Sequence, residues 1–385
     1  MENSISKNVK NIQISGIRKF FNKVLEVPEA VSLTIGQPDF KVPKAIKEKM
    51  VEAIDKDLTT YTKNDGLVEL REEISKYLLN QNIKFSSEEI CVTCGGSEGI
   101  LATLMALIEA GEGVLIPDPA YPAYESCAKL IDGEVITYSL DENFQPNFDD
   151  IEDKIELLNP KVLVVSYPCN PTGALMTKDT YERLSKLIEE HNIIVISDEM
   201  YSSLVYSNGY YSLAQNTKIR DKIIVIGGFS KMFSMTGLRI GYVCANKMIK
   251  NEITKVHQYN TSCAPSIAQI GALEGLKSSM EDVKYMKNTF KERRDYIYSE
   301  LVDMGFESNM PEGAFYIFPS IKKFSNNSEE FCEKLLREGK VAVVPGSAFG
   351  KEGEGYIRIS YCYSIEELRE AMKRLREFLK TYNDK

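Results

Sequence analysis

The sequence predicts an α/β fold: a large domain with a mainly parallel, seven-stranded sheet flanked by helices, plus a smaller α+β domain. Between about residues 88 and 245, strand-like and helix-like segments alternate, which is typical of a parallel sheet covered by helices. Several strand candidates, such as KVLVVS, IIVIS and KIIVI, are continuous apolar runs, as expected of strands that are buried on both faces. Beyond this region, a long charged helix leads into short strands and a final amphipathic helix.

Seven strand candidates define the large domain. In chain order they are 90–93, 114–116, 135–138, 162–166, 193–197, 223–226 and 240–244. Apolar residues recur at helical spacing over 100–108 and over 181–188, between some of these strands. Helical crossovers connect parallel neighbours, so the predicted sheet is mainly parallel.

The C-terminal part of the chain predicts the smaller domain. Segment 278–304 has the pattern of one long charged helix, and the short strand candidates AFYIF, VAVV and YIRIS follow it. The final helix carries one apolar face, made of Ile365, Leu368, Met372, Leu375 and Leu379. We therefore expect residues 46–278 to form the large domain and 279–385 the small one, which the N-terminal segment 1–45 joins.

Charge and hydropathy exclude several classes of protein. With 47 Lys and Arg against 56 Asp and Glu, the net charge is −9, whereas a nucleic-acid binder needs a clustered basic surface. No apolar run approaches the ~18 residues that span a membrane. The N-terminal MENSISKNVK lacks the apolar core of a secretory signal. A cytoplasmic protein without nucleic-acid or membrane partners is expected.

Histidine and cysteine usage argues against a metal site. The only two histidines, His191 and His257, each continue an apolar stripe at helical spacing, and both are expected to be packed residues. A zinc site built on several histidines is thereby nearly excluded. Cys91 and Cys94 form the only CxxC, inside a strand-like stretch where positions i and i+3 point to opposite faces. The eight cysteines are therefore expected to be structural, and no metal is predicted.

A hydrolase is the first functional alternative. Gly95-Gly-Ser97-Glu-Gly99 matches G-x-S-x-G between a strand and a helix, the context of a nucleophile elbow. A hydrolase of this kind would also need a histidine downstream of its acidic residue. Only His191 and His257 follow Ser97, both are expected to be packed on helices, and no histidine follows His257. The simpler interpretation is a helix N-terminus whose free N–H groups can receive a phosphate.

A second set of motifs lies at the ends of strand candidates. They are Asn170-Pro-Thr-Gly173, Asp198-Glu-Met-Tyr201, Gly228-Phe-Ser230-Lys231, Met235-Thr-Gly-Leu-Arg239-Ile-Gly-Tyr242 and, in the second domain, Ile357-Arg358-Ile-Ser360. Each is explicable alone, for example as a turn or a helix cap. Ligands of open α/β sheets bind at strand ends. Together, a carboxylate, an amide, a phenol, a lysine and arginines can hold a charged heteroaromatic ligand there.

These motifs, in this order, resemble those of the class I/II aminotransferases, pyridoxal-phosphate (PLP) enzymes of fold type I. The resemblance runs from Ile35-Gly36-Gln-Pro-Asp39 to the C-terminal helix. The family signature SKxFxMTGxRxGY is present at residues 230–242 as SKMFSMTGLRIGY. The resemblance implies ping-pong transfer of an amino group from an L-amino acid to a 2-oxo acid.

The resemblance also implies a role for each residue around the cofactor ring. Lys231 would bond covalently to PLP and carry a proton during transfer. Asp198 would face the ring nitrogen and keep it protonated, since a carboxylate favours the charged pyridinium. Asn170 and Tyr201 would hydrogen-bond the phenolic oxygen, and Tyr121 would stack on the ring.

The resemblance assigns one set of residues to the phosphate of the cofactor and another set to the carboxylate of the substrate. The phosphate would lie among Ser230, Arg239 and the helix N-terminus at Gly96, Ser97 and Glu98. Because a carboxylate beside a phosphate repels it, Glu98 should contribute its backbone N–H and turn its side chain away. Arg358 would grip the substrate α-carboxylate, with Asn170 and Gly36 beside it. Tyr61 would reach the phosphate of the partner subunit, which implies a homodimer with two shared sites.

Substrate identity stays open among several relatives. Ser97 stands where aspartate-preferring relatives often have a lysine. Segments 14–20 and 256–262 look most like a bacterial branch that acts on N-acetyl-LL-2,6-diaminopimelate in lysine biosynthesis, with 2-oxoglutarate as acceptor. Aromatic or aspartate aminotransfer, and a C–S β-lyase, are the alternatives. Arg18 is a candidate contact for a distal carboxylate or else forms a surface salt bridge, and Cys169 is a candidate for the pocket wall.

Overall fold

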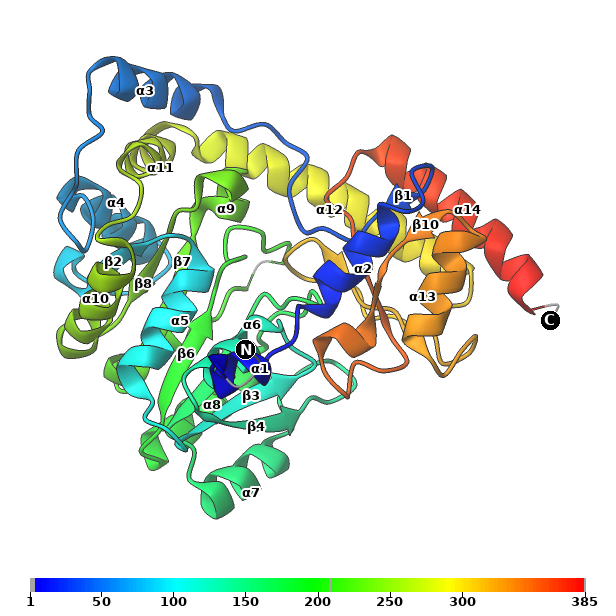
Figure 1. The fold of residues 1–385 in the computed structure, drawn as a ribbon, viewed down its shortest axis with the longest axis horizontal. Coiled ribbons are helices and arrows are strands. Elements are labelled where there is room, and N and C mark those ends of the chain that lie inside the picture. Colours follow the sequence, from blue (N-terminus) through cyan, green and yellow to red (C-terminus); the bar gives the residue numbers. More distant parts are fainter. Residues whose placement is uncertain (1–3, 208, 384–385) are drawn as a thin grey trace.

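A seven-stranded sheet forms the centre of the larger part of the molecule (Figure 1). The computed structural model describes residues 4–207 and 209–383. Across the sheet, the strand order is β2-β8-β7-β6-β5-β3-β4. In chain order these strands are β2 Ile90–Thr93, β3 Gly113–Asp118, β4 Glu134–Ser139, β5 Val162–Ser166, β6 Ile194–Asp198, β7 Ile223–Gly228 and β8 Gly241–Cys244.

All neighbouring strands of this sheet are parallel except at β8, which runs antiparallel to both β2 and β7. The predicted α/β class and the mainly parallel seven-stranded sheet are thus confirmed. Each strand end lies within two residues of its predicted position. The strands form where they were expected because continuous apolar runs can be buried on both faces of a covered sheet.

Helices cover both faces of the sheet and explain those runs. The helices of this part are α3 Lys44–Asp55, α4 Val68–Leu79, α5 Gly96–Leu107, α6 Ala123–Leu130, α7 Phe148–Leu158, α8 Lys178–Glu190, α9 Phe229–Met232, α10 Lys247–Thr261 and α11 Ser266–Ser278. Val164 and Ile196 belong to one core cluster together with residues of α5, α6 and α10. The alternating positions Leu163 and Val195 belong to the other cluster, with residues of α4 and α8.

The second part of the molecule combines small sheets with long helices. Its elements are β9 Tyr316–Ile317, β10 Val341–Ala342, β11 Val344–Pro345 and β12 Ile357–Ser360, with α12 Met280–Asp303, α13 Ser328–Arg337 and α14 Ile365–Asn383. The chain start supplies α1 Lys7–Lys10, α2 Gly16–Val24 and β1 Val31–Ser32, and β1 pairs in parallel with β10. This pairing connects the N-terminal segment with the C-terminal part.

Two details of the C-terminal strands differ from expectation. The predicted strand VAVV is divided, because residues 341–342 pair with β1 while 344–345 pair with β12. Of AFYIF, only residues 316–317 form a strand. The predicted apolar face of α14 is buried at Leu368, Met372, Leu375 and Leu379. The domain limits 1–45, 46–278 and 279–385 stay predictions.

The histidines and cysteines lie where a structural role requires them. His191 follows the last residue of α8, and His257 is fully buried on α10. All eight cysteines are free thiols. Among the described residues, no helix combines the length and the apolar character needed to cross a membrane.

Candidate active site

Polar side chains from four strand ends and from β12 gather at the carboxyl edge of the sheet. Asp198 ends β6, Asn170 follows β5, and Lys231 lies in the short helix α9 directly after β7. Arg239 precedes β8, and Arg358 lies on β12 of the second part. The predicted site residues of five separate motifs are therefore brought to one region, where parallel strands present their ligand-binding ends.

Asp198 is a buried carboxylate held by neutral donors. Its side chain is 9% exposed, and Oδ2 accepts a 2.6 Å hydrogen bond from the hydroxyl of Tyr124. Oδ1 accepts a 3.1 Å bond from the backbone N–H of Met200. Burial raises the pKa of Asp198, while these two hydrogen bonds act in the opposite direction. A cationic group facing this carboxylate would be strongly favoured, because the structure supplies no cation of its own in these contacts.

Tyr124 is a site residue without a role in the sequence-based prediction. It lies on α6, three residues after Tyr121, and its ring packs edge-on to the ring of Tyr121 with centroids 5.8 Å apart. In the sequence, the only indication that Tyr124 belongs to the site is the repeated tyrosine of Pro119-Ala-Tyr-Pro-Ala-Tyr124. Only the fold shows that its hydroxyl reaches Asp198, 74 residues along the chain.

Lys231 carries an amine that is poised to act as a nucleophile. Its Nζ donates a 2.6 Å hydrogen bond to the carbonyl oxygen of Gly36. Burial, with a smaller contribution from the positive charges of Arg358 and Arg239, lowers the pKa of Lys231 to about 8. A substantial fraction of the amine is therefore neutral near pH 8, as nucleophilic attack on a carbonyl requires.

Gly36 has to be a glycine at this site. A Cβ built on Gly36 would lie 1.7 Å from the hydroxyl oxygen of Tyr316. The absent side chain leaves room for the Tyr316 phenol and keeps the Gly36 carbonyl within reach of Lys231.

Arg358 is a buried cation with free donor capacity. It is 2% exposed, and its guanidinium donates to the side-chain oxygen of Asn170 at 2.8 Å and to the carbonyl of Thr34. Its Nε has no hydrogen-bond partner within the described residues. The rings of Tyr316 and Phe349 lie 4.4 and 4.9 Å from the guanidinium carbon. Because these partners are neutral, a carboxylate is the ligand that best fits Arg358.

The turn between β2 and α5 has the features of an anion site. The N-cap Gly95 offers no side-chain cap to the first N–H groups of α5, which are therefore free to bind an anion. The guanidinium of Arg239 lies so close that a Cβ on Gly95 would be 2.7 Å from its Nη2. Ser97 and Arg239 are exposed, while Ser230 is buried.

The side chain of Glu98 turns away from this anion site, as expected. Its Oε2 accepts a 2.6 Å hydrogen bond from the backbone N–H of Cys94, and Oε1 lies 2.6 Å from Nδ1 of His257. The pair also explains why Gly95-Gly-Ser97-Glu-Gly99 is no nucleophile elbow with a triad. His257 is bound to Glu98, and its Nε2 is buried without a partner in the described part of the chain.

The remaining predicted residues differ in burial, and within the part of the chain that the structure describes Tyr61 and Arg18 form no hydrogen bond or ring contact with the residues above. Tyr201 is 7% exposed, and its hydroxyl lies 2.7 Å from that of Tyr316. Cys169 is buried, and Tyr61 is 85% exposed. Arg18 is exposed on α2, with its guanidinium 5.9 Å from the ring centre of Phe21.

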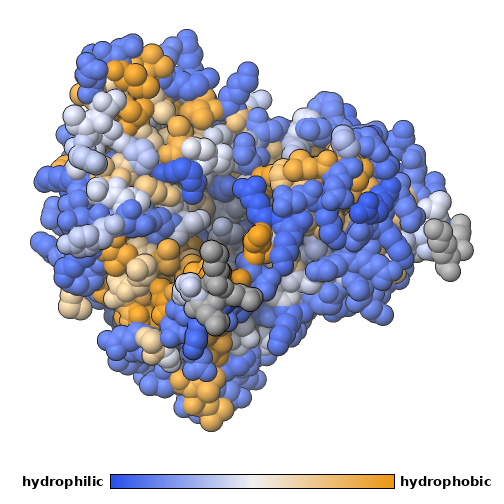
Figure 2. Space-filling model, viewed as in Figure 1, coloured by the Kyte–Doolittle hydropathy of each residue, from blue (hydrophilic) through white to orange (hydrophobic). Residues whose placement is uncertain are grey.

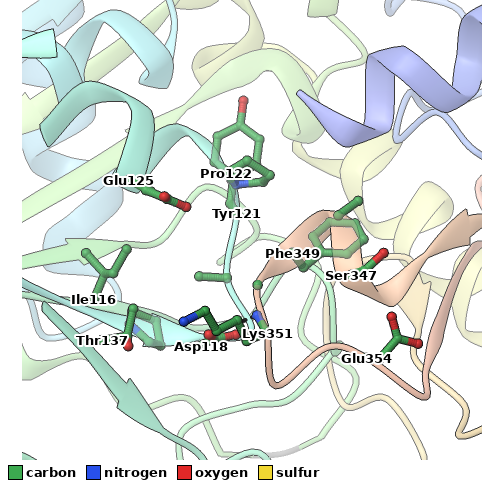
Figure 3. Close-up of a pocket in the computed structure, with 14 residues that line it drawn as sticks. Ile116, Asp118, Tyr121, Pro122, Glu125, Thr137, Ser347, Phe349, Lys351 and Glu354 are labelled. Carbon is green, nitrogen blue, oxygen red and sulfur yellow. Dashed lines mark hydrogen bonds between the residues drawn. The ribbon is translucent and has the colours of Figure 1, made fainter. Parts of the chain in front are cut away.

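A cavity of about 470 Å³ adjoins the site between β3, α6 and the turn 346–349 (Figure 3). Asp118 accepts hydrogen bonds of 3.1 Å from the backbone N–H groups of Lys351 and Glu352. In Figure 3 the ring of Tyr121 points away from Asp118 and Lys351. Asp118 thereby ties the end of β3 to the loop that follows Phe349, a contact that sequence reasoning missed because 233 residues separate the partners.

Comparison with known proteins shows which family this chain belongs to. The family model "Aminotransferase class I and II" matches residues 28–375. This chain is a class I and II aminotransferase. A probable N-acetyl-LL-diaminopimelate aminotransferase of Bacillus subtilis is 42% identical, over 98% of this chain and 96% of that protein. An aspartate aminotransferase of Pyrococcus abyssi is 41% identical, over 98% of both chains.

Solved structures agree with the family assignment. An aromatic aminotransferase from Pyrococcus horikoshii is 40% identical and superposes with a TM-score of 0.90, covering 94% of this chain and 99% of that one. An aspartate aminotransferase from Thermotoga maritima is 35% identical with a TM-score of 0.92, covering 98% and 100%. The aminotransferase is therefore a PLP-dependent enzyme that acts on amino acids and 2-oxo acids.

The donor set of this aminotransferase fits PLP. The buried carboxylate of Asp198 suits a protonated ring nitrogen, and the amine of Lys231 suits a covalent bond to the aldehyde carbon. The uncapped N-terminus of α5, next to Arg239, suits a dianionic phosphate. The free Nε of Arg358 suits the carboxylate of the substrate.

Proposed function

We propose that this aminotransferase transfers an amino group between an L-amino acid and 2-oxoglutarate, with Lys231 as the reacting amine. The observation that carries the proposal is the half-buried amine of Lys231, with a pKa near 8, held on the Gly36 carbonyl. Bound PLP supplies an electron sink for the transfer. The residues of the chain orient it, exclude water and move protons.

We assign the ring contacts as follows. Asp198 faces the ring nitrogen, and Tyr124 holds that carboxylate in place through its 2.6 Å hydrogen bond. Asn170 and Tyr201 donate to the phenolic oxygen, and Tyr121 stacks on the ring. The Nζ of Lys231 would carry the proton that leaves the substrate α-carbon. Its lowered pKa favours this exchange, because a base works best when its pKa is near the working pH.

The anionic ends of cofactor and substrate bind apart from each other. Ser230, Arg239 and the N–H groups of Gly96, Ser97 and Glu98 hold the phosphate. Arg358 binds the substrate α-carboxylate, with Asn170 orienting the guanidinium and Gly36 forming the adjacent wall. Each charge-assisted hydrogen bond of this kind contributes about 1.5–3 kcal/mol.

The functional unit of this aminotransferase is proposed to be a homodimer in the cytoplasm. Tyr61 extends from the loop after α3 and is 85% exposed, so it can reach the phosphate in a partner subunit. Figure 2 shows apolar surface over α3, where Val51 and Ile54 are 57% and 53% exposed. An apolar patch beside Tyr61 is consistent with a surface that a second subunit covers.

For the amino donor, we propose N-acetyl-LL-2,6-diaminopimelate, in lysine biosynthesis. The 42% identical relative from Bacillus subtilis supports this choice, as does Ser97 in place of a lysine. Aspartate and aromatic donors stay as alternatives because relatives with those activities are comparably similar. Arg18, near the start of α2, is the proposed contact for a distal carboxylate.

A panel of amino donors with 2-oxoglutarate tests the proposal directly. Glutamate formation should be fastest with the diaminopimelate derivative, and a preference for aspartate or aromatic donors would replace it. Pyruvate and ammonia released from cystathionine would instead reveal a lyase. Lys231→Ala should abolish the borohydride-reducible bond to PLP. A reducible bond that persists at that position in the variant would overturn the role of Lys231.

A further inference from the structure

A pair of buried phenols, Tyr201 and Tyr316, links the two parts of the molecule. The hydroxyl of Tyr201, from the loop after β6, lies 2.7 Å from the hydroxyl of Tyr316 on β9. Both side chains are buried, at 7% and 2% exposure, and their rings meet edge-on with centroids 5.6 Å apart. Two hydroxyls at this distance share one hydrogen, so one phenol donates and the other accepts.

The surroundings of Tyr316 determine which phenol is the better donor. The guanidinium of Arg358 lies over the Tyr316 ring, with its carbon 4.4 Å from the ring centre. A cation at this distance favours the negative form of the phenol and so strengthens the hydroxyl as a donor. Burial raises the pKa of Tyr316 to about 12, and the positive charge of Arg358 acts in the opposite direction.

The absence of a side chain at Gly36 provides the space for the Tyr316 hydroxyl. The Tyr316 hydroxyl occupies the volume that a side chain at position 36 would take, since a Cβ there would lie 1.7 Å away. Gly36 also accepts the hydrogen bond of Lys231. Tyr316 therefore adjoins Gly36, which holds the Lys231 amine, and also packs against Arg358.

We propose that Tyr316 is a positioning residue for Tyr201: its hydroxyl donates to the Tyr201 oxygen, so that Tyr201 points its own hydrogen at the phenolic oxygen of PLP. The inference rests on the proposed placement of Tyr201 at that oxygen. Tyr316 acts through Tyr201, and the donated bond strengthens Tyr201 as a donor because hydrogen bonds in a chain polarise one another.

The direction of the effect follows from charge. A hydrogen bond from Tyr201 would stabilise negative charge on the phenolic oxygen of bound PLP and would thereby favour loss of the cofactor's titrating proton. Weakening the bond therefore raises the pKa of that proton, which the visible absorbance of the bound cofactor reports. A neutral hydrogen bond is worth about 0.5–1.5 kcal/mol and one pKa unit about 1.4 kcal/mol, so losing the whole Tyr201 bond should raise this pKa by about half a unit to one unit. Losing only the strengthening that Tyr316 provides, about 10–30% of a bond, should raise it by up to about 0.3 unit.

Tyr316→Phe in the holoenzyme tests the proposal, because it removes the hydroxyl and keeps the ring beneath Arg358. We expect Tyr316→Phe to raise the absorbance pKa by up to about 0.3 unit, and Tyr201→Phe to raise it by about half a unit to one unit. In Tyr201→Phe/Tyr316→Phe, the second change should add nothing, since Tyr316 has no phenol left to act on. Full additivity, or an unshifted Tyr316→Phe, would overturn the inference.

Control variants distinguish a specific effect of Tyr316 on Tyr201 from a general effect of removing a buried phenol. Tyr206→Phe removes another buried phenol, whose hydroxyl donates to the Ala314 carbonyl, and should leave the absorbance pKa unchanged. A shift as large as that of Tyr316→Phe would contradict a specific relay. If Tyr316→Phe fails to fold, Tyr316→3-fluorotyrosine, a more acidic phenol, should lower the pKa, and a rise would refute the proposal. An unshifted Tyr201→Phe would instead overturn the proposed placement of Tyr201.

Discussion

At the scale of single residues, the site contains two buried charges, Asp198 and Arg358, and the half-buried amine of Lys231, and their hydrogen-bond partners are neutral. Asp198 is held by a phenol and an amide, and Arg358 by an amide oxygen and a carbonyl. Lys231 is held by a carbonyl. Burying a charge without a countercharge is costly. The site therefore gains most from a ligand that brings a cation to Asp198 and an anion to Arg358.

The cost of burying Lys231 should be measurable in the protein without PLP. The folded protein releases the Lys231 proton near pH 8, against an ordinary value of 10.5. Between these values the unfolded chain holds more protons, so stability should rise as the pH rises through this window. At pH 7, Lys231→Met should stabilise the fold by roughly 2–3 kcal/mol, after allowing for its lost hydrogen bond.

Urea unfolding at fixed protein concentration would measure this difference at pH 7 and at pH 10. The advantage of Lys231→Met should shrink at the higher pH, where the wild-type lysine is neutral in the folded state. Lys178→Met, at a lysine whose side chain is 70% exposed, is the matched control and should change stability little at either pH. An advantage of Lys231→Met that is independent of pH would contradict the lowered pKa.

At the scale of elements, the site depends on what the chain does directly after a strand. After β2, Gly95 adopts φ 83° and starts α5 without a side-chain cap. After β7, helix α9 places Lys231 within three residues of the strand end. Short connections of this kind fix the direction of the next side chains and N–H groups, so the strand ends act as a rigid support for the ligand.

Gly95→Ala should weaken PLP binding more than backbone strain alone predicts. A Cβ there would lie 2.7 Å from the Arg239 guanidinium, in addition to the unfavourable φ. We expect at least a tenfold loss of PLP affinity, about 1.4 kcal/mol, in a fluorescence titration of the protein without PLP. Gly111→Ala, with φ 82° and no atom within 4 Å of its Cβ, carries the same strain without the clash. Equal losses in both variants would argue against a role of Arg239 in phosphate binding.

At the scale of the whole molecule, the site is completed by contacts between distant parts of the chain. The N-terminal segment supplies Gly36 and the Thr34 carbonyl, and the C-terminal part supplies Tyr316 and Arg358. Asp118 fastens the end of β3 to the loop after Phe349. Movement of the C-terminal part relative to the sheet would therefore move Arg358 relative to Lys231.

Mixed dimers would test whether a second subunit also completes the site. If Tyr61 serves the partner subunit, Lys231→Ala and Tyr61→Ala chains should each have little activity alone. A hybrid dimer of the two would contain one site with both residues intact, so coexpression of differently tagged chains should restore about half the wild-type activity per dimer. Hybrids that stay inactive, while each chain still dimerises, would indicate that Tyr61 does not act across the interface.

The sequence by itself determined the large sheet and the chemistry at its edge. Continuous apolar runs predict covered strands because burial on both faces leaves no polar positions. The motifs at the ends of these strands, with the signature at residues 230–242, carried the resemblance to the family. For Lys231, Asp198, Asn170 and Arg239, position at a strand end was sufficient to predict that they would lie together.

Only the tertiary structure decided which partners hold these groups. Tyr124 reaches Asp198 across 74 residues, and Tyr316 reaches Tyr201 across 115. The division of VAVV between two sheets likewise depends on the separate strands that cover its halves. A periodic pattern reports burial along one element, whereas a hydrogen bond between distant residues depends on how elements pack. Local sequence patterns therefore predicted the polar groups of the site, but not the distant residues, such as Tyr124 and Tyr316, that hold them in place.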